Sequence, residues 1–259
     1  MRSLSFGRKY SRVLRLLIVF ASGIALFSQP GVAVQAASSS NAHTSHARAV
    51  TFNAANFHHP ARIDNPYFPL SPGTEFLYIG DEGGQALHES ELVTHQTKMI
   101  LGVPTVVIED NVYLTNGQLY EKTLDWYAQD DSGNVWYFGE YATDYQNGQP
   151  AGHGGSWEGG ILGAQPGIIM EGDSHVGDAY RQEYFKGVAQ DTAAVLSLNA
   201  YVCAPYNCYF NEALETAEWS PLTPGFVEQK WYAPGVGFVK SIAVKGGPEA
   251  FELVGIKQH

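Results

Sequence analysis

The sequence predicts an all-β protein whose strands form an antiparallel curled sheet or half-open barrel. Runs rich in β-branched and aromatic residues recur from residue 75 onward, which is typical of strands. Turn residues separate these runs about every ten residues, as antiparallel hairpins require. A large sheet must close, sandwich or curl to protect its edges, and a curled sheet has a concave face that can hold a ligand.

The expected strands are joined by recognisable turns. Asn116-Gly117 is the strongest short hairpin signal in the chain. The last three runs predict a three-strand meander, with a turn at residues 234–237. The expected strands cover residues 75–80, 86–93, 105–115, 118–129, 135–141, 226–233, 238–245 and 249–256.

Two regions do not fit the strand pattern. Residues 144–177 are so rich in glycine and proline that we expect a long loop there. Residues 189–198 (AQDTAAVLSL) are compatible with one short helix.

Composition restricts the class of partner. The chain has 259 residues, of which 44% are hydrophobic, enough for one sizeable domain with a buried core. The formal net charge of −11 argues against nucleic acid or an anionic membrane surface as the main partner, because both attract clustered basic residues. A small molecule is the expected partner.

Residues 1–36 are expected to be a signal peptide. Their charged residues are all basic, and an apolar run at 16–27 is too short to span a bilayer. Val34 and Ala36 supply the small residues that precede a cleavage site, so we expect cleavage after Ala36 and a secreted or periplasmic protein. An uncleaved N-terminal anchor is the alternative.

The chain after the signal peptide is expected to form a flexible leader at 37–50 and a single β domain at 51–259. Residues 52–76 open that domain and contain four prolines between Pro60 and Pro72. Proline at this density blocks helix, so the segment should be extended and wrap the surface. Phe52, Phe57, Tyr67 and Phe68 are expected to hold it against the domain.

Cys203 and Cys208 are the only cysteines. In an exported chain the expectation is that they form a disulfide, here across the end of a hairpin. A zinc or redox site is the alternative, but no other cysteine and no nearby histidine supports it.

The hairpin at 124–141 contains the residues that we expect to bind a ligand. Pairing residue 129 with residue 135 across the turn places Trp126, Trp136, Phe138 and Glu140 on one face of the ribbon. Trp157, from the glycine-rich loop, is expected to act as a lid side chain. The structural alternative is that these aromatic residues are ordinary core. The register is an assumption, because a one-residue slip moves a strand's side chains to the other face.

No motif for a cofactor, a metal or catalysis stands out. The Asp130-Asp131 turn lacks the remaining ligands of an EF-type calcium loop, and the adjacent His58 and His59 have no ligand spacing. Ser156 follows a histidine and two glycines but has no nucleophile elbow around it. We therefore expect no cofactor, no metal and no catalytic residue, which favours binding over catalysis.

Three phrases carry a resemblance: IDNPYFPLSPGTEF (63–76), DWYAQDDSGNVWYFGE (125–140) and KWYAPGVGFVKS (230–241). Together they resemble a group of uncharacterised exported bacterial β-proteins. The last phrase is similar to the closing strands of lipoprotein-carrier (LolA-like) curled-sheet domains. That similarity implies a half-open antiparallel barrel around a hydrophobic cavity, with no catalytic residues to transfer. The glycine-rich loop and the cysteine pair depart from the carrier pattern.

The sequence therefore predicts an exported, non-catalytic binder of an apolar or amphiphilic small ligand. One alternative is an extracellular glycan hydrolase with Glu140 as its acid and Asp125 or Glu158 as its partner. The assumed register places Asp125 on the face opposite Glu140, which counts against that pair. A structural surface module without a ligand is the other alternative.

Overall fold

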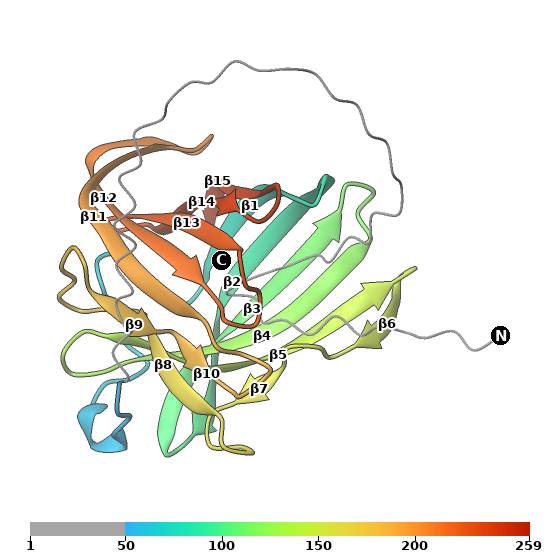
Figure 1. Cartoon of the computed structure of the whole chain (residues 1–259). Coiled ribbons are helices and arrows are strands. Elements are labelled where there is room, and N and C mark those ends of the chain that lie inside the picture. The colour runs from blue at the N-terminus through green and yellow to red at the C-terminus, as the bar shows by residue number, and fades with distance from the viewer. Residues whose placement is uncertain (1–49) are drawn as a thin grey trace.

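A computed structural model describes residues 50–259 of the protein (Figure 1). The expected signal peptide and all but the last residue of the expected leader lie outside the described residues. The described part is almost entirely β, as the sequence predicts, and its one helical element is the 3-10 turn η1 (Ala54–Asn56). The strands are β1 (Thr74–Glu82), β2 (Gln85–Ile100), β3 (Val103–Leu114), β4 (Leu119–Gln129), β5 (Val135–Gln146), β6 (Gln149–Gly152), β7 (Trp157–Glu158), β8 (Gln165–Met170), β9 (Ala179–Arg181), β10 (Glu183–Tyr184), β11 (Thr192–Cys203), β12 (Cys208–Trp219), β13 (Val227–Ala233), β14 (Gly237–Lys245) and β15 (Glu249–Gln258).

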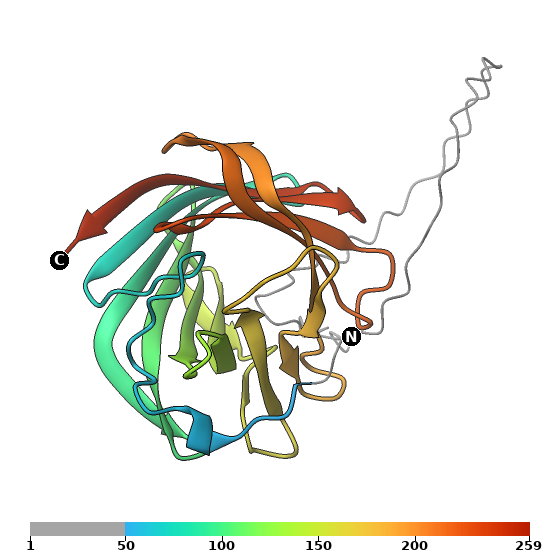
Figure 2. The same cartoon turned by 90° about the vertical axis from the view of Figure 1, so that its left-hand side faces the viewer.

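The strands form one antiparallel sheet that curves into a nearly closed barrel (Figure 2). Their order is β10-β8-β5-β4-β3-β2-β1-β15-β14-β13-β12-β11-β9, with β6 and β7 paired to β5. The N-terminal strand β1 lies between β2 and the C-terminal strand β15, so the two ends of the domain sequence meet inside the sheet. At the seam, β9 pairs with β11 and β10 pairs with β8, and Gln182 alone separates β9 from β10. The curled or half-open barrel that the sequence predicts is confirmed.

Two local predictions are wrong. Residues 144–177 are not one long loop, because they contain the end of β5 and the strands β6, β7 and β8. Residues 189–198 contain no helix; they lead into β11, where Ala193 and Val195 are buried and Ala194 is less so. Burial with a period of two is the pattern of a strand. The helix was expected because alanine is a good helix former.

The hairpins with clear turn signals form as predicted. β3 and β4 meet at Asn116-Gly117, where Gly117 N–H donates to the Leu114 carbonyl. The C-terminal meander is β13, β14 and β15. The conformation of such a turn depends on the residues within it, so these turns could be predicted from short stretches of sequence.

The β4–β5 hairpin follows the predicted register only as far as a β-bulge. Gln129 pairs with Val135 and Ala128 with Trp136, as expected, but Trp126 then pairs with Gly139 instead of Phe138. Beyond this bulge Asp125 lies opposite Glu140. The prediction that Asp125 and Glu140 lie on opposite faces is therefore wrong, because one extra residue in β5 changes the face of everything after it.

The proline-rich segment lies along the domain and is held by its aromatic residues. Phe52 and Phe57 pack edge-on against Trp136, with ring centroids 5.9 Å away in each case. Phe68 reaches Tyr127 on β4 at 5.4 Å and Tyr232 on β13 at 6.3 Å. The aromatic side chains of this extended segment thus fix the segment to the barrel.

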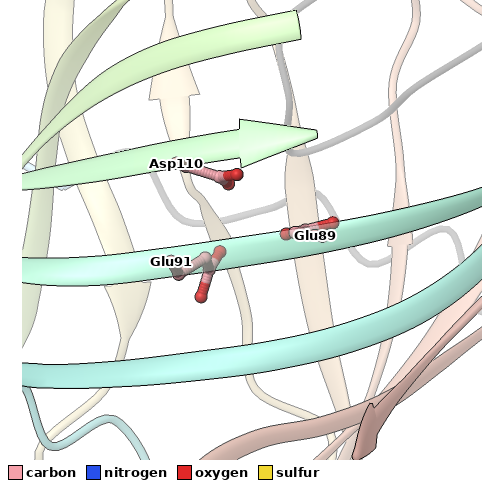
Figure 3. A group of neighbouring side chains, drawn as sticks. All are labelled: Glu89, Glu91 and Asp110. Carbon is pink, nitrogen blue, oxygen red and sulfur yellow. The ribbon is translucent and has the colours of Figure 1, made fainter. Parts of the chain in front are cut away.

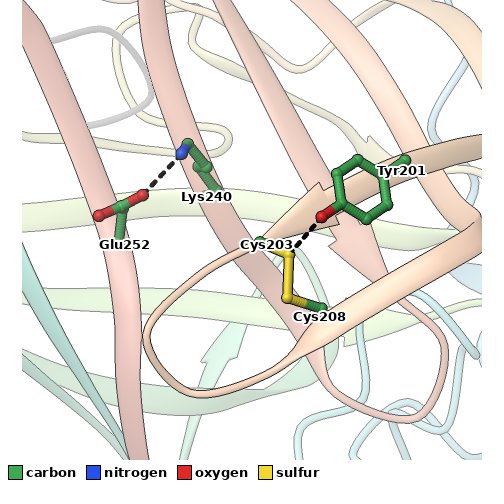
Figure 4. The surroundings of a disulfide bond; sticks show 5 residues. All are labelled: Tyr201, Cys203, Cys208, Lys240 and Glu252. Atoms are coloured by element: carbon green, nitrogen blue, oxygen red, sulfur yellow. Dashed lines mark hydrogen bonds and ion pairs between the residues drawn. A yellow bond between two sulfur atoms is a disulfide. The ribbon is translucent and has the colours of Figure 1, made fainter.

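Cys203 and Cys208 form the expected disulfide, which joins the ends of β11 and β12 (Figure 4). The Tyr201 hydroxyl lies 2.8 Å from the Cys203 sulfur. In the same view Lys240 of β14 pairs with Glu252 of β15 at 2.6 Å. The bridge closes a short loop, so it stabilises the folded chain by about 2 kcal/mol in the chain-entropy account.

Candidate functional site

A cavity of about 130 Å³ lies inside the barrel. Its aromatic lining comes from opposite walls of the barrel and from the proline-rich segment. The rings are Phe68, Tyr127, Tyr137, Tyr232, Phe238 and Phe251. An engineered cavity of about 150 Å³ can hold one benzene ring, so this cavity can hold a group of similar size.

The same cavity has an acidic lining. The carboxylates are Glu89, Glu91, Asp125, Glu228 and Glu249, and the one basic residue among the lining is Lys230. Side chains of a strand alternate between its two faces, and Glu89 and Glu91 lie on the same face of β2 as the core residues Leu87 and Val93. The lining therefore has an excess of negative charge in a low-dielectric surrounding, which favours a cation.

One group of carboxylates has the spacing of a metal site. Oxygens of Glu89, Glu91 and Asp110 lie within 4.8 Å of one another, where β2 and β3 run side by side (Figure 3). Hard cations such as Ca²⁺ prefer oxygen ligands of this kind. Glu89 and Glu91 also line the cavity, so these carboxylates belong to the same acidic interior.

A hydrogen-bonded group begins at one wall of the cavity, where Asp125 and Tyr137 lie on the lining. The Tyr137 hydroxyl lies 2.7 Å from Asp125 and 2.8 Å from Glu140, and all three residues are buried. Burial, followed by the charges of Asp125 and Glu140, raises the pKa of Tyr137 well above its usual value, so the phenol keeps its proton. A phenol has one hydrogen to donate, so the two carboxylates share it.

A second group of charges lies on β12 and β13. Lys230 Nζ lies 2.9 Å from Glu218 and 3.4 Å from Glu228, and Tyr232 donates to Glu218 at 3.1 Å. Burial lowers the pKa of Lys230, but Glu218 and Glu228 outweigh it and hold the pKa above its usual value. Lys230 is therefore a permanent cation that offsets buried carboxylates on the cavity wall.

Asp191 adds a titrating carboxyl to this group. It is 3% exposed, and burial raises its pKa to about 7, against a hydrogen bond from Ser220 and the attraction of Lys230. Glu218 and Glu228 raise that pKa further through their negative charges. An ordinary Asp has a pKa of 3.8, so the folded chain binds more protons than the unfolded chain between about pH 4 and 7.

Stability is therefore expected to fall as the pH rises from about 4 to 7, by the contribution of Asp191. Urea unfolding at pH 5 and pH 8 measures this, and Asp191→Asn should be less pH-sensitive than the unmodified chain. Asp173→Asn, at an exposed position, is the matched control for the same chemical change. Parallel profiles for Asp191→Asn and the unmodified chain would contradict the assignment.

The structure separates the five predicted ligand-binding residues into two groups. Trp126, Glu140 and Trp157 line a groove of about 500 Å³. Trp136 and Phe138 are buried with Phe52 and Phe57, on the face opposite Tyr137. A role of these five residues in ligand binding stays a prediction.

The groove itself is bordered by charged and aromatic side chains. Lys98 lies over the Trp126 ring, 3.4 Å from its centroid, and pairs with Glu158 at 2.7 Å. Tyr141 is 47% exposed and stacks on His153 with centroids 4.8 Å apart. The Trp157 indole N–H donates to Glu183 at 3.0 Å, so Trp157 is anchored in the structure.

Other residues that the sequence singled out have structural partners. Asp130 accepts hydrogen bonds from the backbone of Ser132 and Asn134 and from the Trp136 indole, at 2.8 to 3.0 Å, which closes the β4–β5 turn. His58 pairs with Asp131 at 2.6 Å. The Ser156 hydroxyl bonds backbone atoms of Ala142.

Sequence reasoning missed the acidic lining, although a signal for it exists. On β13, Glu228, Lys230 and Tyr232 alternate with Gln229 and Trp231, so charge falls on one face of the strand. On β2 the same alternation aligns Glu89 and Glu91 with the core residue Leu87. Charged residues at core positions of neighbouring strands indicate a polar interior.

Comparisons with known proteins give two structural similarities. One is to a crystal structure from Bacteroides fragilis NCTC 9343, provisionally described as an exported protein with a YmcC-like fold, with 15% identity, a TM-score of 0.44 and coverage of 74% of this chain and 99% of that one. The other is to a provisionally assigned lipoprotein from Parabacteroides distasonis ATCC 8503, with 14% identity, a TM-score of 0.40 and coverage of 74% and 98%. No model of a known protein family and no curated protein matches the chain. Within residues 50–259, no helix has the length and apolar character needed to cross a bilayer.

Proposed function

We propose that this chain is an exported binding protein that takes a small amphiphilic organic cation into the barrel without transforming it. The observation that carries the proposal is the cavity lining, in which five carboxylates and six aromatic rings accompany a single lysine. Carboxylates attract a cation in a partly enclosed site, and ring faces attract it as well. The predicted signal peptide and the resemblance of residues 230–241 to carrier domains support the export and carriage parts of the proposal.

The lining also specifies what should be excluded. Anionic ligands such as fatty acids or phospholipid headgroups would be repelled by the carboxylates. A neutral apolar ligand would gain from the rings but would gain nothing from the carboxylates of the lining. The expected ligand therefore has a cationic end for the cavity and an apolar part that extends from it.

A matched series of small ligands tests the charge preference. Butylamine, 1-butanol and butyrate have apolar chains of the same kind, and their binding at pH 7.5 can be followed by calorimetry. Butylamine should bind at least about tenfold more tightly than 1-butanol, which corresponds to about 1.4 kcal/mol, and butyrate should bind worst. Glu249→Gln should weaken butylamine binding, whereas Glu158→Gln in the groove should not.

Two results would refute the proposal. Equal binding of the amine and the carboxylate would show that the acidic lining does not select the ligand. Failure of the folded protein to bind butylamine or any other small organic cation would remove the interior site altogether.

The groove is a separate candidate site for an apolar ligand, because it shares no lining residue with the cavity. Trp126 and Trp157 are on its lining, and Trp136 and Phe138 belong to the same packed cluster as Trp126. An apolar fluorescent probe should bind there, and Trp126→Ala should weaken that binding. A probe that binds Trp126→Ala as tightly as the unmodified chain would exclude the groove.

A glycan hydrolase is a second candidate because Asp125 and Glu140 bond the same hydroxyl. That arrangement keeps the two carboxyl groups about as close as the pair in a retaining glycosidase, about 5 to 5.5 Å. The small cavity and the burial of Glu140 favour binding over this activity. Soluble products from a polysaccharide that disappear with Glu140→Gln would support the hydrolase, and their absence would eliminate it.

A further inference from the structure

The aromatic residues of the cavity form a continuous arc. Phe68 lies 5.4 Å from Tyr127 and 6.3 Å from Tyr232, measured between ring centroids. Tyr232 lies 5.9 Å from Phe238. All four rings line the cavity, and Phe68 joins the β4 wall to the β13 wall.

Phe68 is held in this position by the residues just before it. The buried Asn65 side chain donates to the carbonyls of Gly133 and Glu171, at 2.9 and 3.0 Å. The Pro66 carbonyl accepts from Gly235 N–H at 2.7 Å, in the β13–β14 turn. The ring is therefore organised before a ligand arrives, which lowers the entropic cost of binding.

Aromatic rings that line a small cavity favour one kind of organic cation. A primary ammonium is compact and strongly hydrated, and it needs hydrogen-bond acceptors in return for its lost water. A trimethylammonium group has no N–H donor, spreads its charge over its methyl groups and binds well to several ring faces at once. Carboxylates in the lining, here Asp125 and Glu249, then supply charge without needing to accept a hydrogen bond from the ligand.

We propose that Phe68, Tyr127, Tyr232 and Phe238 form a cage for a methylated ammonium group. This rests on the proposed function and names the ligand class of the same cavity. The ligand should not carry an anionic group close to its nitrogen, because the carboxylates around the cage would repel it. A choline-like alcohol or a polymethylated amine fits, and phosphocholine does not.

Methylation of one ligand tests the cage. Butyltrimethylammonium should bind at least about tenfold more tightly than butylamine at pH 7.5 in 0.15 M NaCl, and choline more tightly than phosphocholine. Phe68→Leu should remove most of the preference for the methylated ligand. Phe210→Leu is the matched control, because Phe210 is 69% exposed and lies on β12 outside the cavity lining.

A second variant covers the case in which Phe68→Leu fails to fold. Fluorinated phenylalanines at position 68 keep the ring shape but withdraw its electrons, so each added fluorine should weaken butyltrimethylammonium binding stepwise. Binding of 1-butanol should not follow the fluorine count, since it carries no charge.

The outcomes separate the cage from the proposed function. If butylamine and butyltrimethylammonium bind equally and Phe68 variants change neither, the cage is refuted while cation binding stands. If Ca²⁺ alone binds, through carboxylates such as Glu89, the cage is refuted as well. If no organic cation binds the folded protein, the proposed function fails and the cage fails with it.

Discussion

Replacing Lys230 with methionine is expected to destabilise the protein by about 3 to 5 kcal/mol at pH 8. Lys230 is the cation beside Glu218 and Glu228, which are 1% and 4% exposed. Its removal leaves buried carboxylates without their counter-charge, whereas the methionine chain keeps most of the packing. Urea unfolding at pH 8 measures the loss.

Lys240→Met is the matched control for this substitution. Lys240 lies on the next strand and pairs with Glu252 at 2.6 Å, but both side chains are about a quarter to a third exposed. Its loss should cost no more than about 1 kcal/mol, because water screens an exposed pair. Equal losses for the two lysines would mean that the buried group does not depend on Lys230.

Acidification should partly rescue the Lys230→Met variant. Burial raises the pKa values of Asp191 and Glu228, so protonation removes their charge when the pH falls. The variant should therefore regain stability between pH 8 and pH 5, more than the unmodified protein does. The double variant Lys230→Met/Glu218→Gln should recover part of the loss at pH 8 for the same reason.

Gly139→Ala should have a comparably large effect, about 3 kcal/mol or more. Gly139 has a φ of +128°, and a Cβ there would lie 2.2 Å from the carbonyl oxygen of Trp157. The new methyl group meets the backbone of β7, which cannot move without breaking its pairing with β5. Thermal unfolding and near-UV circular dichroism report the loss of stability and of aromatic packing.

Gly117→Ala separates steric overlap from backbone strain. Gly117 has a φ of +81° and open space around its Cα, so alanine there should cost only about 1 kcal/mol. If Gly139→Ala costs no more than Gly117→Ala, the close approach of β7 does not limit that position.

The strands and turns could largely be read from local patterns. Asn116-Gly117 and the turn at 234–237 act through their own backbone preferences, and the structure contains both hairpins. The loop expected at residues 144–177 is wrong because the strands there are short, and their glycines and prolines conceal the pairing that β5 provides. The helix expected at residues 189–198 is absent because the helix preference of alanine is weak over so short a segment and is overridden by pairing with β9 and β12.

The candidate site was predictable only in part. Glu140 and Trp157 were singled out, yet the cavity is lined by residues such as Glu89 and Phe68 that no catalytic motif contains. Phe68 is 59 residues from Tyr127 along the chain and meets it because the proline-rich segment crosses to the barrel. Contacts between residues so far apart in the sequence depend on how the whole sheet curves.

Alone, the amino-acid order determined that this chain builds a curled antiparallel sheet and that its two cysteines pair. Only the tertiary structure decided which side chains face inward. A single extra residue at Phe138 brought Asp125 and Glu140 to the same hydroxyl. The physical reason is that a strand has a period of two, so one bulge reverses every later side chain, and local preferences are too weak to specify where that bulge falls.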